Sequence, residues 1–152
     1  MLKGHLANRK VRTMAETNAL ATIGATSENV GKMICSIKPS GDRKEDAKIF
    51  AALNNPEFRI ANFINKKISV QNVLVEIREI LNEDTGEIET APRVVLISAD
   101  GKAYQAVSKG IFNAVKNAFE VFGTAPWEPA LEIEIKQVPV GRGSMLTFDV
   151  VG

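Results

Sequence analysis

The sequence predicts a mainly β fold with helices (α+β), in which five strands form a small barrel and one helix lies between the third and fourth strands. Three observations lead to this fold. Apolar and polar residues alternate in short segments from residue 70 onward, turn residues separate these segments, and one longer segment has a helical period. The resulting order, strand–strand–strand–helix–strand–strand, is that of the oligonucleotide/oligosaccharide-binding (OB) fold, which commonly grips single-stranded nucleic acid.

The composition is that of an ordinary soluble globular protein. The chain has 152 residues, of which 45% are hydrophobic and 24% are charged, and this is enough for one domain with an appendage. No apolar run reaches the length of a membrane span, and the first residues lack a secretory apolar core. We therefore expect a cytoplasmic location, in the host cell if a phage encodes the chain, and no contact with a membrane.

The first 31 residues, 1–31, are expected to form a flexible, partly basic arm ahead of a domain that spans 32–152. Residues 15–31 are rich in small and polar residues and have no firm period. Residues 1–12 hold four of the 19 basic residues of the chain, whereas all 18 acidic residues lie farther along. A basic arm on a slightly acidic body is a pattern of nucleic-acid-binding proteins; the alternative is a merely solvated start of the chain.

Two elements are expected before the barrel. Residues 33–37 are a strand candidate, and residues 41–54 have the apolar face and acidic first turns of a helix. Residues 57–67 are ambiguous, since their apolar residues also fit a short helix closed by the basic pair Lys66-Lys67.

The first three barrel strands are expected at residues 70–81, 88–98 and 102–107. Their apolar residues alternate with polar ones, except at the centre of the second strand, which is apolar on both faces. A turn cluster at 82–86 separates the first two strands. Asp100-Gly101 then makes a strong hairpin signal, because both positions of that turn must accept positive φ.

The helix and the last two strands follow. Ser108 can cap the helix, its apolar residues form one stripe, and Gly123 ends it. In an OB fold this helix plugs the bottom of the barrel, so we expect its phenylalanines in the core. Residues 131–136 alternate strictly, and residues 145–151 form the last strand after the glycine-rich tip at 141–143.

The expected binding site lies on the second and third strands and on the loops that join strands one to two and four to five. A single-strand binder needs positive charge for phosphates and flat rings for bases. The chain supplies Arg93, Lys102, Tyr104 and Arg142 at these places. Tyr104 is either a base-stacking ring or a partly buried tyrosine with its hydroxyl at the rim. Arg142 lies between two glycines, where the backbone can approach a phosphate.

Further candidates are weaker. Trp127 lies between two prolines, and it either covers the end of the barrel or stacks on a base. The remaining basic candidates for nucleic-acid binding are Lys66, Lys67, Arg78 and Lys136. One feature argues against DNA: the loop at 82–87 holds three acidic residues and no basic one, so either the strand runs elsewhere or this loop meets a protein.

No enzyme motif is present in the sequence. The chain lacks a phosphate-cradling Gly-Lys-Ser/Thr loop, a nucleophile elbow and paired histidine ligands. One cysteine and one histidine exclude an internal disulfide and a zinc site with the usual four nitrogen or sulfur ligands. We therefore expect no enzymatic activity, no cofactor and no metal.

Residues 32–152 also resemble a known family. The resemblance is carried by Gly101-Lys-Ala-Tyr-Gln-Ala-Val-Ser108, the phenylalanine-rich helix after it, Phe122-Gly-Thr-Ala-Pro-Trp-Glu-Pro129, Glu134-Ile-Lys-Gln-Val138, Asp84-Thr-Gly-Glu87 and Ala91-Pro-Arg-Val-Val-Leu-Ile97. In these stretches the chain is similar to single-stranded DNA-binding proteins of bacteriophages and mobile elements of Firmicutes. The resemblance implies an OB-like fold, a replication or recombination setting, and binding that coats exposed strands. The ending Thr147-Phe-Asp-Val-Val-Gly152 departs from the acidic, partner-recruiting tail of bacterial housekeeping relatives.

These observations predict a non-enzymatic, non-sequence-specific single-stranded DNA-binding protein of a phage or mobile element. Its expected partners are single-stranded DNA, replication or recombination proteins, and further copies of itself along the strand. The alternative is an OB-like barrel used for protein contacts, as an accessory or structural phage protein without nucleic-acid binding. A low-specificity nucleic-acid enzyme ranks third, because no acidic cluster of metal-ligand type is present.

Overall fold

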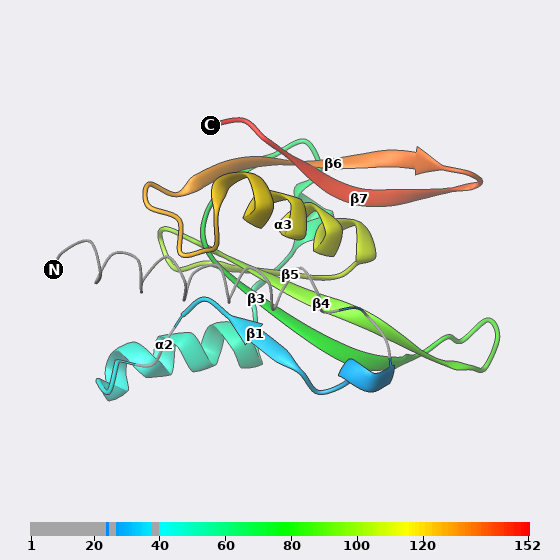
Figure 1. Ribbon diagram of the computed structural model, residues 1–152, viewed down its shortest axis with the longest axis horizontal. Coiled ribbons are helices and arrows are strands. Elements are labelled where there is room, and N and C mark those ends of the chain that lie inside the picture. Colours follow the sequence, from blue (N-terminus) through cyan, green and yellow to red (C-terminus); the bar gives the residue numbers. More distant parts are fainter. Residues whose placement is uncertain (1–23, 25–26, 38–39) are drawn as a thin grey trace, which may run out of the picture.

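A curled mixed sheet and two α-helices make up the described part of the chain, which is mainly β and half-barrel in shape (Figure 1). The computed structural model describes residue 24 and residues 27–37 and 40–152. The basic cluster expected in residues 1–12 lies outside the described residues. No described helix is long and apolar enough to cross a membrane.

Five strands of the sheet correspond to the five expected from the sequence. They are β3 (Lys67–Leu81), β4 (Ile88–Ser98), β5 (Ala103–Val107), β6 (Leu131–Val140) and β7 (Gly143–Val150). Their spatial order is β5-β4-β3-β6-β7, which is consistent with an OB-like barrel. The helix α3 (Lys109–Phe122) follows β5 and precedes β6 in the chain.

The sheet has seven strands, two more than the five of the expected barrel, and one of these two lies in the strand candidate expected at 33–37. The short strand β1 (Met33–Cys35) pairs with β3, and the two-residue strand β2 (Phe58–Arg59) pairs in parallel with β5. The 3₁₀ helix η2 (Ile60–Phe63) follows β2, and a further 3₁₀ turn, η1 (Ser27–Asn29), precedes β1. The ambiguous segment 57–67 is thus mostly a strand and a 3₁₀ turn. The sheet ends at β2 and β7, and within the described chain no ladder joins β5 to β7.

The last two residues of the segment expected to be an arm contact the rest of the fold. The amide of Gly31 donates to the carbonyl of Ile77 at 2.9 Å, and Val30 packs against the core. Residues 30 and 31 therefore contact the domain that we expected to begin at residue 32.

The long strand β3 connects the two halves of the sheet. One of its edges pairs with β4 from Val70 to Leu81, and the other pairs with β6 at 67–70 and with β1 at 74–76. Its register with β4 shifts between Val70 and Asn72. Such an irregularity bends a strand and increases its twist, so β3 can serve both halves of the curled sheet.

The helix α3 closes the inside of the curled sheet. The Ser108 hydroxyl accepts from the Ile111 amide at 3.1 Å at its start, and Gly123 ends it with a φ of 85°. The stripe expected from the sequence faces the core, where Ile111 and Val115 are fully buried and Phe119 is 6% exposed. Burial of an apolar stripe against a sheet is the main reason that such a helix is stable.

The helix α2 (Arg43–Asn54) covers the opposite face of the sheet (Figure 1). Asp42 caps it, since its carboxylate accepts from the Lys44 amide at 3.0 Å. Ala52 and Leu53 of α2 pack against a small cluster of buried side chains. This outer cluster consists of Leu74, Val95, Ile97 and Ala103, with Cys35 and Ile37 beside it.

Gly110 allows α3 to lie against β7. A Cβ at this position would overlap the carbonyl oxygen of Leu146 and the side chain of Met145. Overpacking of this kind costs about 1–3 kcal/mol. We therefore expect Gly110→Ala to lower the free energy of unfolding by this amount in urea denaturation.

The matched control is Gly143→Ala. The nearest atom to a Cβ there is 4.0 Å away, the carbonyl oxygen of Val140, so this change should leave stability nearly unaltered. Equal stability of the two variants would contradict the close approach of α3 and β7.

Candidate nucleic-acid interface

A groove runs between the two ends of the curled sheet. It has a volume of about 350 Å³. Its lining comes from the β2–η2 segment, from β5 and from β7: Arg59, Ala61, Gln105, Ala106, Val107 and Leu146. Arg59 is exposed and makes no ion pair with any described residue. The groove therefore offers an unneutralised cation beside small and apolar side chains.

Three aromatic rings lie together on β2, η2 and β5, the elements that supply most of the groove lining. The rings of Phe58 and Tyr104 are stacked, with centroids 5.1 Å apart and planes at 24°. Phe63 meets Tyr104 edge to face at 5.0 Å and Phe58 at 5.6 Å. Phe58 and Phe63 are each half-buried, so both residues keep some surface exposed to solvent. Open rings of this kind are platforms on which bases can stack.

Cations flank this aromatic cluster of Phe58, Phe63 and Tyr104. The Lys66 ammonium lies 5.8 Å from the centre of the Phe63 ring. Lys102 is exposed and pairs with Asp100 at 3.7 Å. Arg59 follows Phe58 directly in the chain. Of the sequence candidates, the structure thus brings together Tyr104, Lys102 and Lys66, and it adds Phe58 and Phe63. Arg59 pairs with Gln105 on the other side of the same strand and lines the groove there.

Tyr104 itself is part of the core. It is 8% exposed, and Phe58 and Phe63 both contact its ring. The expectation that its ring stacks on a base does not fit this geometry, because neighbouring side chains cover the ring. An exposure of 8% is nearer to the alternative, a partly buried tyrosine with its hydroxyl at the rim. Burial raises the pKa of its phenol, against a smaller opposing effect of the nearby Lys102 charge.

Arg93 is also buried, at 7% exposure. Its Nη2 donates to the carbonyl of Leu53 at 3.1 Å, and its Nε donates to Oε1 of Gln105 at 3.3 Å. The helix α2 lies over this part of β4 and β5, whereas we expected an open binding face there. In this conformation Arg93 holds α2 and does not face a groove.

Trp127 covers the end of the barrel. It is 6% exposed, its ring meets that of Phe119 at 5.5 Å, and its Nε1 donates to the carbonyl of Gly123 at 3.0 Å. This agrees with the covering role and leaves no open ring face for a base.

The other basic candidates are dispersed. Arg78 pairs with Glu76 at 3.4 Å, and Lys136 pairs closely with Glu134, which lowers the pKa of the Glu134 carboxyl. Lys67 lies opposite Glu134 in the ladder between β3 and β6. Arg142 is exposed at the tip of the β6–β7 hairpin. Carboxylates therefore neutralise part of the track that these residues were expected to form.

The acidic loop at 82–87 is the tip of the β3–β4 hairpin, and Glu83, Asp84 and Glu87 are exposed there. This hairpin and the β6–β7 hairpin extend toward the same side of the molecule (Figure 1). The two tips carry opposite charge, so a phosphate chain is repelled from one of them and attracted to the other.

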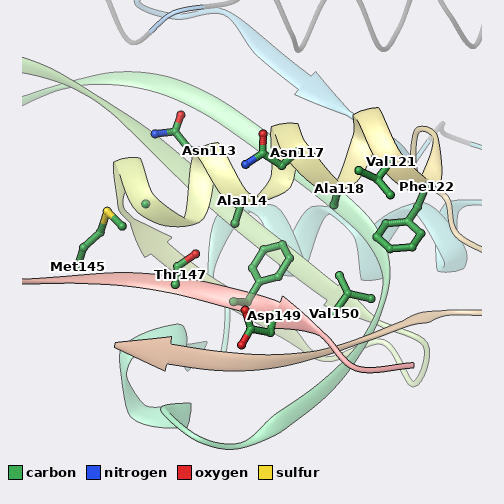
Figure 2. A pocket seen from close by; sticks show the side chains of 12 residues that line it. Asn113, Ala114, Asn117, Ala118, Val121, Phe122, Met145, Thr147, Asp149 and Val150 are labelled. Atoms are coloured by element: carbon green, nitrogen blue, oxygen red, sulfur yellow. The ribbon is translucent and has the colours of Figure 1, made fainter. Parts of the chain in front are cut away.

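A second groove lies between α3 and β7, with a volume of about 340 Å³. Figure 2 shows Asn113 and Asn117 on α3, and Thr147 and Asp149 on β7, along its sides. The Asp149 carboxylate disfavours a phosphate chain, and no cation lines this groove among the described residues. The groove beside Arg59 is therefore the better candidate for nucleic acid.

Sequence reasoning missed Phe58, Phe63 and Arg59. A strand of two residues is too short to show a period, and a 3₁₀ turn hides which residues share a face. The available signal was the occurrence of two phenylalanines shortly before a Lys-Lys pair. Among the described residues, no group of three or more His, Cys, Asp or Glu side chains could hold a metal ion.

Comparison with known proteins gives one finding. A family model described as phage single-stranded DNA-binding protein matches residues 27–149. No curated protein and no solved structure gives a significant match.

The buried environment of Tyr104 can be measured directly, because the chain has a single tyrosine. We expect its phenolate absorbance to titrate at higher pH in the folded protein than in urea, since burial raises the pKa of the phenol. Because the folded-state pKa is the higher one, the stability from this group is complete below the unfolded-state pKa. It is lost as the pH rises through the folded-state pKa. A folded-state midpoint at or below that in urea would mean that the hydroxyl environment differs from the one described.

Proposed function

The chain belongs to the family of phage single-stranded DNA-binding proteins, and from this membership we propose that it coats single-stranded DNA without sequence preference. The proposed setting is phage or mobile-element DNA replication or recombination in the host cytoplasm, without enzymatic activity. The groove beside Arg59 and the aromatic cluster form the proposed contact surface.

The observation that carries this proposal is that partly exposed aromatic rings and cations without an ion pair occur on the same short segment of the chain, β2 to Lys66. Phe58 and Phe63 are half-buried, and the Lys66 ammonium lies 5.8 Å from the centre of the Phe63 ring. Arg59 lies on the same strand as Phe58 and lines the groove on the other side of this strand. Neither cation makes an ion pair with a described carboxylate. Stacking contributes about 1–3 kcal/mol per base and tolerates any base, because every base has a flat face. Cations bind phosphates, which are common to all sequences. Such a surface supports binding that does not depend on sequence.

Protein contacts form a second part of the proposal. The exposed acids of the β3–β4 tip favour a basic protein surface over DNA, since carboxylates repel phosphates. We infer that copies of the protein associate along the strand and that replication or recombination proteins bind there. A barrel used only for protein contacts would have the same acidic tip, but it would need no open rings beside cations.

The first test compares labelled oligothymidine with a duplex of the same length, at two salt concentrations. We expect preferential binding of the single strand, because stacking needs unpaired bases. We also expect binding to weaken with salt, since cations of the protein displace counterions from the phosphates. Equal affinity for both nucleic acids, or no binding to either, would contradict the proposed function.

Two variants should separate stacking from charge. Phe63→Ala should weaken oligothymidine binding by about 1–3 kcal/mol with little change in the salt dependence. Arg59→Ala should reduce the slope of log affinity against log salt by about one contact. Fluorescence anisotropy titrations at several salt concentrations measure both effects.

The matched charge control is Lys116→Ala. This lysine lies on α3 with its ammonium 5.2 Å from the Phe112 ring, and it is not among the residues that line the groove. It should leave both affinity and salt slope nearly unchanged. If all three variants bind alike while circular dichroism shows that each is folded, the strand lies on another face.

A further inference from the structure

The helix α2 is attached to the sheet by few contacts. None of its residues, all of which are described, is buried, whereas six residues of α3 are. Its apolar contact with the outer cluster comes from Ala52 and Leu53 in the last turn, and Phe50 one turn earlier is 67% exposed. A helix held in this way is an element of low local stability, of the kind that opens before the rest of the fold.

Within the described residues, a buried cation, Arg93, makes the one hydrogen bond between the sheet and α2. Arg93 donates to the Leu53 carbonyl and to the Gln105 amide oxygen, and both are neutral groups. Glu76 lies directly opposite Arg93 in the β3–β4 ladder, but its carboxylate pairs with Arg78 at 3.4 Å. Among the described residues, Arg93 therefore makes no ion pair.

A phosphate would be a better partner for Arg93 than these neutral groups. Burial lowers the pKa of its guanidinium, because the charged form loses hydration there, and the nearby Glu76 carboxylate opposes part of this effect. A bidentate bond from arginine to phosphate is charge-assisted and about twice as strong as a neutral hydrogen bond. Exchange of the Leu53 carbonyl for a phosphate oxygen would thus offset much of the penalty for burying this charge.

The position of Arg93 connects it to the candidate groove. Gln105 accepts from Arg93 and lies opposite Arg59 in the ladder between β2 and β5. Gln105 and Arg59 both line the groove. The residues Arg59, Gln105 and Arg93 therefore form a continuous row, which the last turn of α2 covers at the Arg93 end.

We propose that the last turn of α2 is a displaceable cover, and that a bound single strand moves it and takes its place on the Arg93 guanidinium. This inference rests on the proposed function, because it adds Arg93 to the same DNA-binding surface and makes access to Arg93 depend on the position of α2. While the cover is closed, Arg59 and the aromatic cluster are open to the strand and the Arg93 guanidinium is not. The free protein then binds with an affinity reduced by the fraction of molecules in which the cover is closed.

Two substitutions test this proposal, one at each partner of the hydrogen bond between Arg93 and Leu53. Leu53→Ala removes apolar contact of the cover and keeps the arginine, so it should tighten oligothymidine binding several-fold. Arg93→Gln also loosens the cover but removes the phosphate partner, so it should weaken binding and lower the salt slope. If α2 were only a structural cover, the two variants would shift affinity in the same direction or not at all, and that result would overturn the proposal.

Hydrogen exchange provides a readout that does not depend on affinity. In the wild-type protein we expect the amides of the last turn of α2 to exchange faster when oligothymidine is bound. Slower or unchanged exchange would contradict displacement. Val121→Ala is the matched control for Leu53→Ala, since Val121 is a 73% exposed apolar residue on α3; it should change neither exchange in α2 nor affinity.

The outcomes separate this inference from the proposed function. Absence of binding by the wild-type protein would remove the function itself. Wild-type binding together with unchanged α2 exchange, and with Leu53→Ala binding like wild type, would remove only the displaceable cover.

Discussion

The double pairing of β3 is the constraint on which the rest of the structure depends. One edge of this strand pairs with β4 from Val70 to Leu81. Its other edge pairs first with β6 and then with β1. The register shift after Val70 bends it. The sheet consequently curls, encloses α3, and leaves its two end strands, β2 and β7, without a partner for closure within the described residues. The candidate groove lies where that closure is incomplete.

This incomplete closure explains where binding residues gather. The parallel pairing of β2 with β5 places Phe58 opposite Tyr104 and Arg59 opposite Gln105. On one side of this pairing lies the half-buried ring of Phe58, against the core. On the other side lies Arg59, which lines the groove. The two residues of β2 therefore contribute to both the core and the proposed interface. A change that disturbs β2 should affect stacking and charge together.

The sequence predicted the barrel strands and the capped helix well, because strict alternation and an apolar stripe of several turns are strong local signals. It did not reveal β2, whose two residues have no period. It also placed Arg93 and Tyr104 on an open face. Both residues lie on the strands that were expected, β4 and β5. However, α2 covers Arg93, and Phe58 and Phe63 cover Tyr104. Which segment covers a sheet face is a tertiary property that no local pattern encodes.

The central claim is that single-stranded DNA stacks on the half-buried rings of Phe58 and Phe63 and not on the most exposed ones. Ultraviolet cross-linking to oligothymidine, followed by mass spectrometric mapping, tests this most directly. The account predicts cross-links at Phe58 or Phe63. Phe50 and Phe122 are 67% and 49% exposed, so a strand that bound without a defined surface would react with them instead. Cross-links confined to those two residues would contradict the account.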